Sequence, residues 1–115
     1  MKFINPENNI NCDNVIQCIF ELNKLDVKVY KILKKTREIR ADELAKKLKK
    51  DRSNVYRSLQ NLTCCGLCIK EQRNIENGGY YHTYRFSNTK KIKKELEKQI
   101  NNWYIKMKNT LKELE

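Results

Sequence analysis

The stretch that decides the fold is "ADELAKKLKKDRSNVYRSLQNLTCCGLC", residues 41–68. Apolar residues recur at helical spacing in both of its halves, which predicts one helix over about residues 41–48 and another over about 52–65. Negative side chains open the first helix, and Asp51 is a candidate N-cap for the second. Gly66 then follows as a residue that can take the positive φ with which helices end. Two short helices joined by a brief basic turn predict a helix-turn-helix.

The second of these helices carries side chains suited to reading nucleic acid. Val55, Leu59 and Leu62 are spaced to form an apolar inner face. The polar side chains that remain outside are Arg52, Ser53, Asn54, Tyr56, Arg57 and Gln60. Arginine pairs with guanine and asparagine or glutamine with adenine in the major groove, while serine and the N-terminal amides suit a phosphate. The alternative is an ordinary solvated surface helix.

The segments on either side predict further elements. One helix is expected from Asp13, and another over about residues 25–35, where Val27, Tyr30 and Leu33 should be buried. Beyond the glycine, "LCIKEQR" and "YYHTYRF" are rich in β-branched and aromatic residues and are separated by "NIENGG", a pattern typical of a hairpin. With only three glycines and one proline, the predicted fold class is mainly α (α+β). We expect a winged helix-turn-helix with a two-stranded β-hairpin wing.

Ser87 is the candidate cap of a long final helix. Its apolar residues, three or four positions apart, form one stripe: Ile92, Leu96, Ile100, Trp103, Met107, Leu111 and Leu114. Folding back on its own domain is one way to cover this stripe, but a length of about 40 Å favours a homodimer. The expected organisation is a flexible arm at residues 1–12, the winged helix at 13–86 and a dimerisation helix at 87–115.

The charge balance restricts the class of partner. Lysine and arginine number 25 against 14 acidic residues, so the net charge is +11 and the pI is about 9.5. This surplus predicts attraction to polyanions, with nucleic acid ahead of an anionic membrane surface. The sequence contains no apolar run long enough for a membrane span, and its start, "MKFINPENNINCDN", does not resemble a signal peptide. We therefore expect a cytoplasmic protein with no membrane partner.

The five cysteines favour reduced thiols over a secreted disulfide framework. Cys65 and Cys68 form a C-x-x-C pair with Cys64 adjacent, but a structural zinc site usually needs four ligands, and the lone His82 lies on another element. We expect no metal site and no cofactor. Packing is the favoured role of the three cysteines, and redox sensing is the alternative. No catalytic constellation is visible, so an enzyme is not expected.

These residues resemble a known family, the archaeal TrmB-like transcriptional regulators, whose shape is similar to that of the MarR group. The matching segments are "LDVKVYKILKK", "ELAKKL" and "RSNVYRSLQNLTCCGL", with "YRF" as the second wing strand, so that the resemblance covers about residues 25–86. It implies a homodimeric DNA-binding regulator whose recognition helix spans residues 52–62. Larger members add a sugar-binding domain, for which we expect no room here. Arg40 stands where a serine or threonine cap is common, so that cap should be weaker.

We expect a sequence-specific transcriptional regulator that binds double-stranded DNA as a homodimer; whether it has a small-molecule effector is not encoded in any motif of the sequence. The tip of the wing carries Glu76 and little positive charge, which leaves Arg73 and Arg85 as the wing's phosphate contacts. The expected DNA-binding residues are Arg40, Lys49, Lys50, Arg52, Ser53, Asn54, Tyr56, Arg57, Gln60, Arg73 and Arg85. The alternatives are an architectural nucleoid protein that binds DNA through charge alone, and a winged-helix module that binds other proteins.

Overall fold

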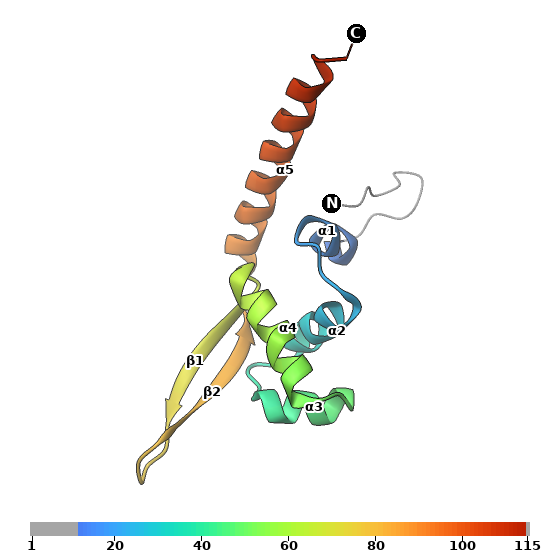
Figure 1. Cartoon of the computed structure of the whole chain (residues 1–115). Coiled ribbons are helices and arrows are strands. Elements are labelled where there is room, and N and C mark those ends of the chain that lie inside the picture. Colours follow the sequence, from blue (N-terminus) through green and yellow to red (C-terminus); the bar gives the residue numbers. More distant parts are fainter. Residues whose placement is uncertain (1–11, 115) are drawn as a thin grey trace. The chain divides into compact units, whose positions relative to one another are not determined.

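Residues 12–114 are described by a computed structural model of the chain (Figure 1). In order, its elements are α1 (Cys12–Ile19), α2 (Lys24–Lys35), α3 (Ala41–Leu48), α4 (Arg52–Cys64), β1 (Cys68–Asn74), β2 (Tyr80–Phe86) and α5 (Thr89–Leu111). The chain divides into two compact units, one formed by residues 22–87 and the other containing α1 and α5. Apart from Cys12, the arm expected at residues 1–12 lies outside the described residues.

The core of the 22–87 unit lies where α4 contacts α2, α3 and β1. Val55, Leu59 and Leu62 are fully buried there, which confirms the inner face predicted for α4. On α2 the prediction was only partly right, because Val29 is fully buried whereas Val27 is half-buried. The reason is that α2 packs against β2 as well as α4, so its buried arc is wider than one amphipathic stripe.

The helix starts differ in how they are capped. Asn23 and Asp26 form a reciprocal capping box at α2, with the Asp26 amide donating to Asn23 Oδ1 at 2.8 Å. Arg40 and Asp51 occupy the N-cap positions of α3 and α4, but neither side chain makes a capping hydrogen bond. Ser87 does not cap the last helix as predicted. Its amide donates to the Leu67 carbonyl at the end of the hairpin, and Asn88 caps α5 instead.

The end of α4 bears out the role expected of Gly66. Its φ is +81°, and its amide donates to the Thr63 carbonyl at 3.1 Å. The next amide, that of Leu67, donates to the Leu62 carbonyl at 2.9 Å, and both leucine side chains are buried. These two bonds, with the two buried leucines, define a Schellman motif, which turns the chain directly from α4 into the wing.

The wing is an antiparallel hairpin in which Cys68 is paired with Phe86 and Asn74 with Tyr80. Its turn lies away from the three helices of the unit, and Gly78 and Gly79 both have positive φ there (Figure 1). At the other end the Phe86 ring lies 5.7 Å from the ring of Tyr30 on α2. The predicted winged helix-turn-helix is therefore confirmed.

The link before α3 is joined to β2 of the wing by an isolated antiparallel β-bridge. Ile39 exchanges two backbone hydrogen bonds with Tyr84, at 2.9 and 2.8 Å. Both side chains are buried, so the link is held against β2 by apolar packing as well as by hydrogen bonds.

In the other unit α1 packs against α5, and Ile16 and Ile92 are buried. The long final helix is present over 23 residues. Along its predicted stripe Leu96 and Trp103 are half-buried, whereas the exposed members are Ile100, Met107, Leu111 and Leu114. No helix in residues 12–114 is both long and apolar enough to span a membrane.

Candidate nucleic-acid interface

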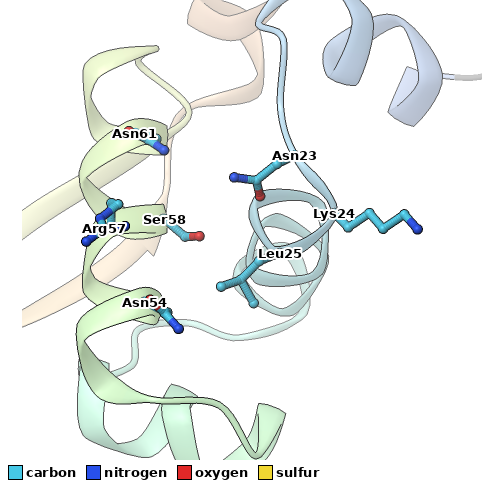
Figure 2. Close-up of a pocket in the computed structure, with 7 residues that line it drawn as sticks. All are labelled: Asn23, Lys24, Leu25, Asn54, Arg57, Ser58 and Asn61. Carbon is cyan, nitrogen blue, oxygen red and sulfur yellow. The ribbon is translucent and has the colours of Figure 1, made fainter.

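The outward surface of α4 carries the polar side chains that the sequence assigned to DNA. Arg52, Ser53, Asn54, Tyr56, Arg57 and Gln60 are all exposed, while the opposite side of the helix is anchored in the core. Two of them, Asn54 and Arg57, also line a pocket between α4 and the start of α2 (Figure 2). The structure thus brings these six residues together on one presented helix.

The two arginines of α4 differ in whether their guanidinium groups form a salt bridge. Arg52 Nε lies 2.7 Å from Asp42 Oδ1, so its guanidinium ties the start of α4 to α3. Arg57 forms no salt bridge with any residue of the described part. An exposed pair of this kind contributes only about 0–1 kcal/mol, but it still has to be broken or shared before Arg52 can bind a base or a phosphate. Arg57 is therefore the arginine of α4 that is free to bind.

Lys49 and Lys50 lie exposed between α3 and α4. Lys49 has a φ of +53°, and the Lys50 amide donates to the Ala45 carbonyl at 3.1 Å. This left-handed residue ends α3 in the way that Gly66 ends α4, but with a side chain where glycine is usual. The backbone geometry places both ammonium groups in the turn between the two helices.

On the wing, Arg73 and Arg85 are held by carboxylates. Arg73 Nη2 lies 2.7 Å from Glu38 Oε2 and 2.8 Å from Glu71 Oε2, and Arg85 Nε lies 2.6 Å from Glu71 Oε1. The hydrogen bond from Arg73 lowers the pKa of Glu38, and the same carboxylate raises the pKa of Arg73. The expected phosphate contacts thus belong to an ion-pair network between the wing and the link before α3, and their contact with DNA stays a prediction.

Sequence reasoning missed Glu38 and Glu71 as partners of these arginines. Glu71 could have been found, because strand periodicity places it on the same face as Arg73 and pairs it in register with Thr83, next to Arg85. Glu38 has no such local signal.

The remaining predicted contact, Arg40, stacks its guanidinium over the ring of Tyr81, 4.5 Å from the centroid. Lys70, which sequence reasoning also missed, has its Nζ 5.8 Å from the ring centre of Tyr56 on α4. The pKa of Tyr84 on β2 is raised, chiefly by burial and to a smaller extent by the nearby Tyr56. Lys70 therefore adds a positive charge beside the presented face of α4.

The cysteines at the end of α4 are free thiols. Burial raises the pKa of Cys65, with Cys64 and Asp26 adding to the effect, and burial also raises that of Cys68. Cys64 is exposed. Among the described residues no three histidine, cysteine, aspartate or glutamate side chains are grouped to hold a metal ion. Because the thiolate is the reactive form, a raised pKa favours packing as the role of Cys65 and Cys68.

A three-helix core, a β-hairpin wing and a polar, basic helix presented beside it define a winged helix-turn-helix protein of the DNA-binding class. Residues 16–90 match the family described as "Sugar-specific transcriptional regulator TrmB", and the chain belongs to that family. It is a family of transcriptional regulators and not of enzymes, as the sequence predicted.

The similar proteins are archaeal. An uncharacterized protein of Methanocaldococcus jannaschii is 36% identical over 103 residues, which cover 90% of this chain and 78% of that protein. Among solved structures, a "possible transcriptional regulator" from Methanosarcina mazei Go1 is 30% identical with a TM-score of 0.81, over 98% of this chain and 96% of the other. A Sulfolobus tokodaii protein shares the fold, with a TM-score of 0.67 and 22% sequence identity. The match covers 82% of this chain and 92% of that one.

Proposed function

We propose that this regulator binds double-stranded DNA sequence-specifically as a homodimer, with residues 52–62 of α4 in the major groove. The observation that carries the proposal is the division of α4 into a fully buried side and an exposed side rich in hydrogen-bond donors. Arg57, which has no salt bridge with a described residue, is the principal base-reading residue. A helix of this kind fits the major groove, where each base pair displays a distinct pattern of donors and acceptors.

The charge of the α3–α4 segment supports binding to the DNA backbone. Its basic residues are Lys46, Lys47, Lys49, Lys50, Arg52 and Arg57. Within residues 46–57 the single acidic side chain is Asp51. Lysines that neutralise phosphates release counterions, so the affinity should fall steeply as the salt concentration rises.

The homodimer is supported by the exposed apolar residues of α5. Leu111 and Ile100 are 63% and 43% exposed on its stripe, and Leu114, which follows the end of α5, is 78% exposed. A second copy would remove this stripe from water and would place two recognition helices about 34 Å apart, in successive major grooves. In this proposal residues 13–86 bind DNA and residues 87–115 hold the dimer together.

The test is selection of bound fragments from genomic DNA at physiological salt, followed by footprinting and a measurement of mass in solution. A pseudo-palindromic footprint and a dimeric mass are expected. Arg57→Ala should reduce the discrimination between cognate and random DNA, whereas Lys49→Ala should weaken binding to both equally and reduce the salt dependence. Equal effects of both changes on both DNAs would instead indicate an architectural protein that binds through charge alone. A monomer without DNA affinity would indicate a protein-interaction module.

A further inference from the structure

A pocket of about 460 Å³ lies between the start of α2 and the middle of α4 (Figure 2). Its lining residues are Asn23, Lys24, Leu25, Asn54, Arg57, Ser58 and Asn61. Figure 2 shows Asn54, Ser58 and Asn61 extending from α4 towards α2, whereas the ammonium end of Lys24 extends away. No acidic side chain lines the pocket. We infer that it is a phosphate-binding site, and that its occupant is a phosphate of the DNA backbone beside the groove that α4 enters.

The start of α2 has unused hydrogen-bonding capacity. The first amides of a helix have no intrahelical acceptor. The Asp26 amide donates to Asn23 Oδ1 and the Val27 amide to the Asn23 carbonyl, at 2.8 and 3.1 Å. The amides of Lys24 and Leu25 donate to no group of residues 12–114. Two free amides at the positive end of a 12-residue helix suit an anion.

Ser58 on α4 points to a ligand independently of that helix end. This residue is 3% exposed, yet its hydroxyl makes no hydrogen bond with any described residue. By contrast, the hydroxyl of Thr63 on the same helix donates to the Leu59 carbonyl at 2.7 Å. The Ser58 hydroxyl points into the pocket (Figure 2). Ser58 therefore presents a hydroxyl donor without a partner in the described part of the chain at the wall of the pocket, where an oxygen of a ligand can accept from it.

The charge around the pocket also favours an anion. Arg57, the proposed base-reading residue, also lines the pocket and has no salt bridge in the described part of the chain, so its charge raises the positive potential there without its being the phosphate ligand. The nearest carboxylate on α2, that of Asp26, is 97% buried and turned back to the Asn23 amide, so it offsets part of the positive potential without lining the pocket. The side-chain amides of Asn54 and Asn61 add neutral donors. Donors from two helices suit the several acceptor oxygens of a phosphate.

We assign the bound phosphate to the DNA backbone because the pocket shares two residues with the exposed face of α4. Asn54 and Arg57 belong both to that exposed face and to the lining of the pocket. A strand bordering the groove that α4 occupies would pass along this side of the helix. Contacts of this kind fix the register of the protein on the duplex without reading sequence. The inference rests on the proposed function, since it assumes that α4 enters the groove.

The test uses the full chain with Asn61→Asp, which adds a carboxylate to the pocket at nearly unchanged volume, and Ser58→Ala, which removes the hydroxyl. Asn101→Asp on α5 is the matched control for the change in charge, because Asn101 is exposed and does not line the pocket. Duplex affinity is measured on cognate and random DNA over a range of salt concentrations. Inorganic phosphate is titrated separately into the DNA-free protein, with amide chemical shifts as the readout. Thermal unfolding verifies that each variant is folded.

Asn61→Asp should weaken binding to both DNAs about tenfold or more, and Ser58→Ala about threefold to tenfold, while Asn101→Asp changes the affinity less than twofold. Such a result supports a DNA phosphate. If both pocket variants keep full duplex affinity but lose the response of the Leu25 and Ser58 amides to inorganic phosphate, the site takes a free phosphorylated compound. Unchanged duplex affinity together with no response to phosphate in the unmodified protein overturns the inference. Loss of sequence discrimination alone in the pocket variants would overturn the inference, since a phosphate site is expected to act equally on all sequences. An unmodified protein that does not distinguish cognate from random DNA would instead count against the proposed function.

Discussion

The guanidinium of Arg73 on β1 lies 2.7 Å from the carboxylate of Glu38, which belongs to the link before α3. This ion pair joins the wing to the helical core, together with the backbone bonds between Ile39 and Tyr84. The pKa of Glu38 is lowered, chiefly by the hydrogen bond from Arg73, from its usual value of 4.5. A lowered folded-state pKa contributes stability that is fully present above the unfolded value and is lost as the pH falls through the folded value.

We therefore expect the attachment of the wing to be independent of pH above about pH 5 and to loosen below the ordinary glutamate range. Amide hydrogen exchange of β1 and β2, followed from pH 6 to pH 3, measures this. Glu38→Gln should show the loosened wing already at pH 6, with less pH dependence below it. Equal pH dependence in both proteins would contradict the assignment to Glu38.

Gly66 and Lys49 predict stability changes of opposite sign. Both have left-handed backbone conformations, with φ of +81° and +53°. Gly66→Ala should destabilise the fold by about 1 kcal/mol, because a Cβ at Gly66 meets no atom within 4 Å and only the conformational penalty applies. Lys49→Gly should stabilise it by up to about 1 kcal/mol by removing that penalty. Urea unfolding of the two variants and the unmodified protein tests both signs.

Local patterns in the sequence predicted most of the fold. The inner face of α4 follows from the spacing of Val55, Leu59 and Leu62, and the end of that helix from the backbone freedom of Gly66. Such features depend on neighbours within about one helical turn. The burial of Val29 in place of Val27 did not follow, because it depends on β2 packing against a second side of α2.

The candidate site was only partly predictable, because part of it depends on residues that are distant in the sequence. The exposed polar residues of α4 follow from helical phase, but the ion pair of Arg73 with Glu38 joins residues 35 positions apart. The pocket also needs α2 and α4 to be packed together, which no pattern within either helix encodes. That the hydroxyl of Ser58 has no hydrogen-bond partner among residues 12–114 depends in the same way on the packing of α4 against its neighbours.

Arg57 and Arg52 should differ in their contribution to DNA binding. Arg57→Ala should cost about 1–3 kcal/mol on cognate DNA and relax the preference at the base pair it reads. Arg52→Ala should cost less, because binding through Arg52 first has to break its ion pair with Asp42, and its loss should also loosen the start of α4 against α3. Affinities for cognate duplexes with single base-pair changes distinguish the two. A larger loss for Arg52 than for Arg57 would show that the ion pair is exchanged for DNA at little cost.

The three cysteines at the end of α4 should react with a thiol reagent at different rates. Cys64 is exposed, whereas burial raises the pKa of Cys65 and of Cys68 and so lowers the fraction of reactive thiolate near pH 7. Mass spectrometry after brief alkylation should find Cys64 modified first and Cys68 last. DNA binding should be equal for the reduced protein, the oxidised protein and a variant with all cysteines changed to serine. A loss of affinity confined to the oxidised form would support redox sensing instead.

The stripe of α5 predicts the state of the protein in solution. Leu111→Glu and Ile100→Glu place a charge where two copies would bury their apolar side chains, and each should shift the mass from dimer to monomer at micromolar concentration. Asn102→Glu is the matched control, since Asn102 is exposed and helical spacing places it away from the stripe. Sedimentation equilibrium measures the mass, and circular dichroism verifies the helix. Because one monomer offers a single recognition helix, monomeric variants should protect one half-site and lose much of their affinity for the full operator. A mass that is unchanged in both stripe variants would mean that this face of α5 does not form the dimer.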